Sequence, residues 1–169
     1  KISGRQRQLL KVGVRVEQFE KTLVSSPWFD TFTADTFNQL PQDWQIDLGN
    51  YCNSACVFCS PSNSSRLAQE WQTIGLIKNL PPNNWTDNQD LIERFVGTLS
   101  QSPHIRYLHF IGGETVITPA FKTILQALVQ AGLNRTATIG FTTNLTVWDS
   151  QVIDLLKQFR GVNLGMSVE

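Results

Sequence analysis

The sequence predicts an α/β fold built around a parallel sheet, and three observations lead to this prediction. Short segments of strand character alternate with segments of helical periodicity along most of the chain. Each predicted strand is separated from the next by enough residues to hold a crossover helix, as parallel strands require. The 169 residues are 41% hydrophobic, which suits a single domain with its own core.

The first 43 residues are predicted to form a helical lead-in to this fold. Apolar residues at helical spacing predict a helix over residues 6–23, and the aromatic residues and prolines that follow indicate an irregular segment. The alternation of apolar and polar residues that marks the first strand begins at Trp44. We therefore divide the chain into a lead-in, residues 1–43, and an α/β domain, residues 44–169.

Four strands are predicted in the α/β domain from their alternating or continuously apolar pattern. They cover residues 44–48, 105–111, 136–143 and 162–168. No helix follows the last strand to cover that edge of the sheet. We therefore expect this chain to be part of a longer protein.

Helices are predicted between the strands from apolar periodicity and from end signals. They cover residues 64–80, a segment from a cap at Thr86 or Asp87 to Leu99, residues 118–131 and residues 148–159. Thr118 and Pro119 favour the start of the third helix, because proline suits the first helical position, and Gly132 favours its end. Thr146 or Asp149 is expected to cap the fourth helix.

The three cysteines, Cys52, Cys56 and Cys59, lie within eight residues of one another. An odd number of clustered cysteines is unlike a disulfide framework and indicates a metal site in a reducing compartment. Thiolates suit iron–sulfur clusters and zinc alike, but a structural zinc site needs a fourth ligand. The two histidines, His104 and His109, are both expected to be ordinary residues rather than ligands.

A strand followed by C-x3-C-x2-C, with Phe58 just before the last cysteine, resembles the radical S-adenosylmethionine (radical SAM) superfamily. Three further matching motifs end the later strands: Gly112-Gly113-Glu114, Thr143-Asn144 and Ser167. The resemblance covers about residues 44–169. It implies that the α/β domain is a partial (β/α)6 TIM-barrel-like radical SAM core, in which only four strand–helix units are visible.

The resemblance also implies the chemistry of the site. Three cysteines hold three irons of a 4Fe–4S cluster, and the amino and carboxylate groups of S-adenosylmethionine (SAM) chelate the open iron. An electron from a flavodoxin- or ferredoxin-type donor then cleaves SAM, and the 5′-deoxyadenosyl radical abstracts hydrogen from a peptide or small-molecule substrate.

The roles of individual residues follow from the same resemblance. Cys52, Cys56 and Cys59 are expected to bind the cluster, and Phe58 to flank the adenine of SAM. The alternative for Phe58 is packing within its loop.

The strand ends are expected to complete the cofactor site. Gly112 and Gly113 are expected to let the backbone approach the cofactor. The Glu114 carboxylate is expected to receive the SAM ammonium, and the Gly113 carbonyl to share that task. Thr143 and Asn144 are expected to line the cofactor or substrate pocket, and Ser167 and Glu169 to contact the SAM ribose or carboxylate.

Two departures and two alternatives accompany this interpretation. Thr115 stands where the usual motif has proline, and the core shows four of six units.

Gly-Gly-Glu followed by a Thr-Asn strand end resembles the branch with SPASM or twitch extensions. A glycyl-radical enzyme activase is an alternative that the long lead-in disfavours. A non-catalytic iron–sulfur or zinc-binding module is the other, but it leaves Gly112-Gly113-Glu114 without a purpose.

Composition limits the partners and the compartment. The net charge is zero, which makes nucleic acid an unlikely partner. No apolar run approaches the roughly 20 residues of a membrane span. An oxygen-labile cluster is expected in the cytoplasm.

Overall fold

The computed structural model describes residues 41–102 and 104–167, which belong to one compact unit, Pro41–Glu169. The predicted helix at residues 6–23 and the candidate ligand Glu169 lie outside the described residues.

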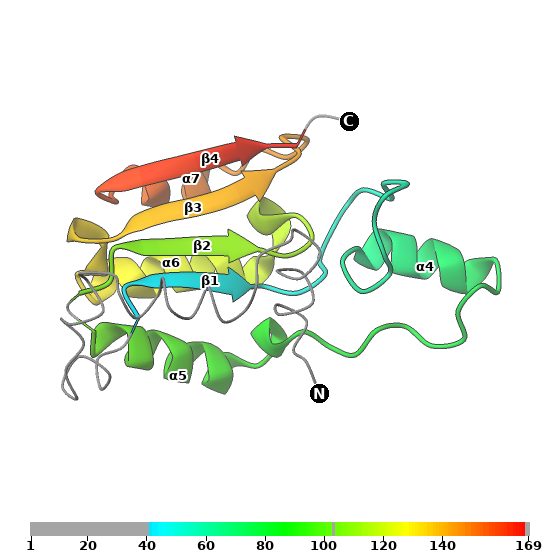
Figure 1. Ribbon diagram of the computed structural model, residues 1–169, viewed down its shortest axis with the longest axis horizontal. Coiled ribbons are helices and arrows are strands. Elements are labelled where there is room, and N and C mark those ends of the chain that lie inside the picture. Colours follow the sequence, from blue (N-terminus) through cyan, green and yellow to red (C-terminus); the bar gives the residue numbers. More distant parts are fainter. Residues whose placement is uncertain (1–40, 103, 168–169) are drawn as a thin grey trace, which may run out of the picture. The chain divides into compact units, whose positions relative to one another are not determined.

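The described residues form one sheet of four parallel strands in the order β1-β2-β3-β4 (Figure 1). The strands are β1 (Asp43–Asp47), β2 (Tyr107–Ile111), β3 (Thr138–Thr143) and β4 (Gly161–Met166). Each pair of neighbours is parallel, so all four carboxyl ends lie at one edge of the sheet. The predicted α/β fold with a parallel sheet is confirmed, and each strand differs from its predicted bounds by at most two residues.

In the part of the chain that the structure describes, four α-helices accompany the sheet: α4 (Ser65–Thr73), α5 (Gln89–Ser100), α6 (Pro119–Gln130) and α7 (Ser150–Leu156). Helices α5, α6 and α7 lie on one face of the sheet, and α4 projects beyond the carboxyl ends of the strands (Figure 1). This order of strands and helices agrees with a partial TIM-barrel-like core, in which ligands bind at the carboxyl ends of the strands.

The hydrophobic core lies between the sheet and helices α5 to α7. Leu108 and Phe110 alternate in β2 with half-buried residues, as the sequence predicted, and both are fully buried. Phe110 packs edge-on against Phe121 of α6, with ring centroids 5.2 Å apart. Burial of such side chains, at about 25 cal/mol per Å² of apolar surface, is the main force that holds the sheet on its helices.

The opposite face of the sheet carries a polar and small-residue row across all four strands. Gln45, His109, Gly140 and Asn163 are neighbours in register on β1, β2, β3 and β4. The interior of a complete TIM barrel is usually filled by bulky branched side chains. This row instead leaves hydrogen-bonding groups on the face that corresponds to the barrel interior.

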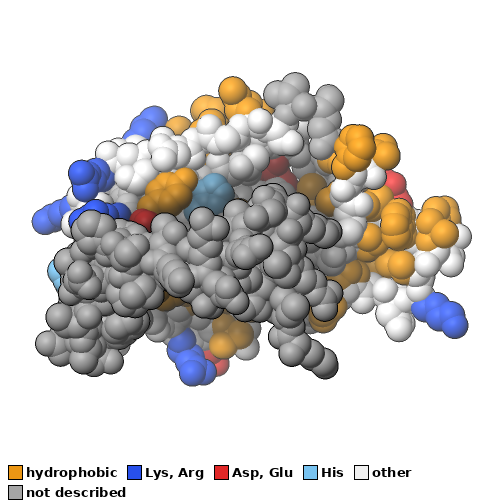
Figure 2. Space-filling model, in the orientation of Figure 1, with side chains coloured by type: hydrophobic (Ala, Val, Ile, Leu, Met, Phe, Trp, Pro, Cys, Tyr) orange, Lys and Arg blue, Asp and Glu red, His pale blue; other side chains and the backbone are white. Residues whose placement is uncertain are grey.

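Helix α4 is shorter than the predicted segment, residues 64–80. It ends at Thr73, and Gly75 follows with a φ of 77°. A glycine in this left-handed region is a common helix stop, and the sequence prediction overlooked it. Ile74, Leu76 and Leu80 therefore lie beyond the helix and are exposed. Hydrophobic side chains gather on the surface in the region of α4 (Figure 2).

The caps of the other helices partly match the predictions. Thr118 precedes Pro119 at the start of α6, and Gly132 follows its end with a φ of 76°, as predicted. Asp149, rather than Thr146, caps α7. For α5 the prediction of Thr86 or Asp87 was wrong, because the cap is Asn88, whose side-chain oxygen accepts hydrogen bonds from two backbone N–H groups. Residues 85–87 form a separate 3-10 turn instead.

Candidate functional site

The cysteine loop, residues 49–64, connects β1 to α4 and is held by the first residues of that helix. The Ser65 hydroxyl accepts a hydrogen bond from the Cys52 N–H at 3.1 Å and donates one to the Cys52 carbonyl at 3.2 Å. The Ser64 hydroxyl donates to the Ser54 carbonyl at 2.6 Å and accepts from the N–H of Leu67, which caps α4. Two adjacent serines therefore fix both the helix and the start of the loop.

The glycines of the Gly-Gly-Glu motif bring the end of β2 against the cysteine loop. The Gly113 N–H donates to the Gly49 carbonyl at 2.8 Å, and the Glu114 N–H donates to the Tyr51 carbonyl at 2.6 Å. Gly112 has a φ of 140°, which other residues rarely adopt, and a Cβ at Gly113 would collide with the Tyr51 carbonyl. The sequence predicted a close approach to a cofactor, and the structure adds a close approach between two backbone segments.

Glu114 is buried, with 2% of its surface exposed. One carboxylate oxygen, Oε2, accepts a hydrogen bond from the Asn144 N–H at 2.7 Å, and the other, Oε1, accepts one from the Val116 N–H at 3.4 Å. The carboxylate thus joins the end of β2 to the turn after β3. Each carboxylate oxygen has two acceptor positions, so one on each remains for a ligand. The predicted role of Glu114 as the acceptor of an ammonium group stays a prediction.

Thr115, which stands in the place of the usual proline, is the first residue of a short 3-10 helix that Glu114 caps. Proline is tolerated at the first helical position, where an N–H has no partner within the helix. A proline would therefore be compatible with this turn, and threonine occupies the position without the ring constraint.

Asn144 connects the turn after β3 to the cysteine loop. Its side-chain nitrogen donates to Asn53 Oδ1 and to Ser54 Oγ, each at 3.1 Å. Its side-chain oxygen accepts from the Thr146 N–H at 2.9 Å. The sequence predicted that Asn144 lines a pocket, but it did not predict these partners.

One cavity of about 790 Å³ lies at the carboxyl ends of the strands. This volume is within the range of small-molecule and cofactor sites, roughly 300–1,000 Å³. All ten predicted site residues that the structure describes line it: Cys52, Cys56, Phe58, Cys59, Gly112, Gly113, Glu114, Thr143, Asn144 and Ser167. The folding of the chain therefore brings together residues that are more than 100 positions apart in the sequence.

Phe58 and Ser167 both line this cavity and differ in how the chain holds them. Phe58 is 97% exposed, so its ring does not pack within the loop, which was the alternative to a ligand contact. The Ser167 N–H donates to the Thr143 carbonyl at 3.0 Å, which continues the pairing of β3 with β4 to the rim of the cavity. Thr143 is buried, and its hydroxyl accepts from the Leu145 N–H at 3.1 Å.

The three cysteines are each half-buried and are the candidate metal ligands. Two local contacts shape their loop: the Cys59 N–H donates to the Cys56 carbonyl at 3.0 Å, and the Ser54 N–H donates to Cys52 Sγ at 3.4 Å. Among residues 41–102 and 104–167, no three His, Cys, Asp or Glu side chains converge as a site for a single metal ion. Thiolates of a cluster bind different irons, so they need not converge on one point, and an all-thiolate donor set suits iron–sulfur chemistry.

Arg66 and His109 make contacts outside the main cavity. Arg66 is exposed and pairs with Glu70 one turn along α4 at 3.1 Å. His109 lies on the face of the sheet opposite helices α5 to α7, where its Nδ1 is 3.1 Å from the Tyr107 hydroxyl. Neither side chain lines the cavity.

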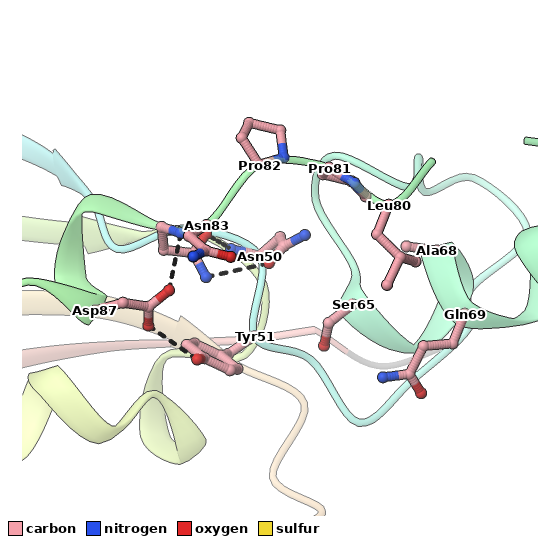
Figure 3. A pocket seen from close by; sticks show the side chains of 11 residues that line it. Asn50, Tyr51, Ser65, Ala68, Gln69, Leu80, Pro81, Pro82, Asn83 and Asp87 are labelled. Atoms are coloured by element: carbon pink, nitrogen blue, oxygen red, sulfur yellow. Dashed lines mark hydrogen bonds between the residues drawn. The ribbon is translucent and has the colours of Figure 1, made fainter. Parts of the chain in front are cut away.

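A second, smaller cavity of about 210 Å³ lies between the cysteine loop and the loop before α5 (Figure 3). At its edge the Tyr51 hydroxyl points to Asp87 and donates a hydrogen bond at 2.9 Å. This bond to the carboxylate, together with partial burial and the negative charge of Asp87, raises the pKa of the Tyr51 hydroxyl. The Asn50 N–H donates to Asn84 at 2.9 Å. The contacts hold the base of the cysteine loop in place.

Sequence reasoning missed several residues of the main cavity, among them Ser54 and Thr146, and it also missed Asn53, which bonds to Thr146. The Asn53 side chain donates to the Thr146 hydroxyl at 2.8 Å, although the two residues are 93 positions apart. Only the Asn144 to Thr146 spacing, typical of an Asx turn, could have indicated part of this network.

The comparison with protein families agrees with this geometry. A family model described as the radical SAM superfamily matches residues 46–169, well over half of the chain. This protein belongs to the radical SAM superfamily. A search of curated proteins found no match. Among the described residues, no helix has both the length and the apolar character needed to cross a membrane.

Proposed function

We propose that this protein is a radical SAM enzyme in which Cys52, Cys56 and Cys59 hold a 4Fe–4S cluster. The observation that carries the proposal is the cavity of about 790 Å³, which these three thiols share with the Gly-Gly-Glu and Thr-Asn strand ends. When bound, the cluster supplies the electron that cleaves SAM, and the 5′-deoxyadenosyl radical that results takes a hydrogen atom from the substrate.

The residues of this chain bind and orient the cofactor. The exposed ring of Phe58 is available to stack on the adenine of SAM. The Glu114 carboxylate and the Gly113 carbonyl are the groups that we assign to the SAM ammonium, because both residues line the cavity and a carboxylate binds an ammonium strongly. Thr143, Asn144 and Ser167 line the remaining wall, toward SAM or the substrate.

We further propose that the chain belongs to the branch with SPASM or twitch extensions, because it combines Gly112-Gly113-Glu114 with Thr143-Asn144. The proposed substrate is a peptide or small molecule, and the proposed electron donor is a flavodoxin- or ferredoxin-type protein of the cytoplasm. The polar row on the sheet face opposite helices α5 to α7, with Gln45, His109 and Asn163, supports a substrate with hydrogen-bonding groups.

The test is anaerobic reconstitution of the protein with iron and sulfide. We expect about four irons per chain, the composition of one 4Fe–4S cluster, and formation of 5′-deoxyadenosine when SAM and dithionite are added. Replacement of any one cysteine by alanine should abolish cluster assembly. Ser60→Ala changes the same loop without removing a thiol and should leave the iron content unchanged. A protein that takes up zinc and forms no 5′-deoxyadenosine would contradict the proposal.

A further inference from the structure

Asn144 tethers a specific part of the cysteine loop. Its side-chain nitrogen donates to Asn53 Oδ1 and Ser54 Oγ, and both acceptors lie between Cys52 and Cys56. The partners are 91 and 90 positions from Asn144 in the sequence, so these bonds depend on the tertiary fold. The contact joins the end of β3 to the segment that carries two of the candidate cluster ligands.

The orientation of the Asn144 side chain is itself fixed from two sides. Its backbone N–H donates to the buried carboxylate of Glu114 at 2.7 Å. Its side-chain oxygen accepts from both the N–H and the hydroxyl of Thr146, at 2.9 and 2.6 Å. The Thr146 hydroxyl in turn accepts from Asn53 Nδ2 at 2.8 Å. Asn53, Asn144 and Thr146 thus form a closed hydrogen-bonded ring that Glu114 anchors to the end of β2.

A loop without regular structure has conformational freedom that ligand binding must remove, at a cost in conformational entropy. Contacts that order a metal-binding loop in advance reduce this cost and hold the ligands in place. On the other side of the loop, Ser64 and Ser65 hold Ser54 and Cys52 from α4. The Asn144 contacts supply the corresponding constraint from the sheet.

We propose that Asn144 is a positioning residue for the cluster, which holds the Cys52–Cys56 segment against the sheet and is itself held by Glu114. This inference rests on the proposed function, because it assumes a cluster on the three cysteines. It gives the Glu114 carboxylate a second role in addition to the proposed contact with the SAM ammonium.

The experiment compares Asn144→Ala, Asn53→Ala and the double variant with the unaltered protein. Asn134→Ala is the matched control, because the Asn134 side chain also donates an interloop hydrogen bond, to the Gln158 carbonyl at 2.9 Å. Hydrogen–deuterium exchange of residues 50–59 is measured on the metal-free proteins. The rate of iron release to a ferrous chelator is measured on the anaerobically reconstituted proteins.

We expect Asn144→Ala to accelerate exchange in residues 50–59. It should also accelerate iron release by about threefold to tenfold, because one or two net hydrogen bonds that hold the loop are lost. Asn53→Ala should have a smaller effect, because the Asn144–Ser54 bond remains. The effect of the double variant should be less than the sum of the two single effects, because each single variant already removes the Asn53–Asn144 bond. Asn134→Ala should change neither measurement.

Unchanged exchange in residues 50–59 of the Asn144→Ala variant would show that the Asn144 side chain does not restrain the cysteine loop. Faster exchange with unchanged iron release, or fully additive effects in the double variant, would overturn its role in positioning the cluster. If exchange accelerates as expected but the unaltered protein assembles no cluster, the proposed function fails while the tether stands. The metal-free measurement therefore separates the two failures.

Discussion

The Tyr107 hydroxyl lies 3.1 Å from His109 Nδ1, and the two rings stack on the face of the sheet opposite helices α5 to α7, with their centroids 5.8 Å apart. The pair occupies the space beside Gly140 on the neighbouring strand, where a Cβ would collide with both side chains. A glycine in the middle of a strand usually weakens the strand, and here it makes room for a hydrogen-bonded aromatic pair.

The first prediction concerns this packing. Gly140→Ala should lower the free energy of unfolding by about 1–3 kcal/mol, because the new methyl group forces the pair and its strand to move. Urea unfolding followed by circular dichroism measures the change. Gly97→Ala is the control, since a Cβ at that position in α5 would meet none of the described residues beyond its own helix backbone and chain neighbours within 4 Å. This control should be neutral or stabilising by up to about 1 kcal/mol. Equal free energies of unfolding for the two variants would contradict the prediction, because the Tyr107–His109 pair would then accommodate the methyl group without a loss of stability.

The second prediction concerns the buried carboxylate of Glu114. Glu114→Ala should lower the free energy of unfolding by about 1–3 kcal/mol, because the N–H of Asn144 loses its acceptor in a part-buried position. It should also weaken SAM binding, since the proposed acceptor of the ammonium is removed. Urea unfolding and calorimetric titration with SAM measure the two effects separately.

The control for Glu114 is Glu93→Ala on α5, where the carboxylate accepts only an exposed side-chain hydrogen bond from Gln89. This variant should bind SAM normally and lose less than about 0.5 kcal/mol of stability. Normal SAM affinity in the Glu114→Ala variant would contradict the role assigned to the carboxylate, whatever happens to its stability.

The third prediction concerns the link between α4 and the cysteine loop. Ser64 is fully buried, and its hydroxyl both caps α4 and donates to the Ser54 carbonyl. Ser64→Ala should cost about 1–2 kcal/mol of stability, because a helix cap and a carbonyl partner are lost together. Thr98→Ala is the control, since the Thr98 hydroxyl bonds only to the Arg94 carbonyl of its own helix. Thermal unfolding with equal midpoints for the two variants would contradict the prediction.

Much of the fold could be predicted because its signals are local. The parallel sheet and the limits of α6 follow from the sequence, because each of their signals spans only a few residues. These signals are the residue pattern of the strands, Thr118-Pro119 at the start of α6 and Gly132 after its end. The end of α4 was missed because Gly75 was not weighed as a stop against the continuing apolar residues. A helix stop that competes with continuing apolar residues shifts the end of the helix without changing the fold.

The candidate site shows a different limit. The ten residues were identified through motifs at strand ends, which a parallel sheet necessarily gathers at one edge. The side-chain partners of Asn144 were missed, because Asn53 and Ser54 approach it only through the conformation of the folded cysteine loop. No spacing in the sequence encodes that conformation, since it depends on α4, β2 and β3 together.

The last prediction concerns the exposed ring of Phe58. Because 97% of this residue is exposed, Phe58→Ala should leave the free energy of unfolding within about 0.5 kcal/mol of the unaltered protein. If the ring stacks on the adenine of SAM, its loss should weaken SAM binding by about 1–3 kcal/mol, as for other aromatic–base contacts. Phe58→Trp retains an aromatic face and should restore most of the affinity. The control is Val57→Ala, because Val57 is 93% exposed in the same turn and has no aromatic face. SAM affinity is measured by calorimetry on reconstituted protein. Equal affinities of the Phe58→Ala and Val57→Ala variants would show that the Phe58 ring does not contact SAM.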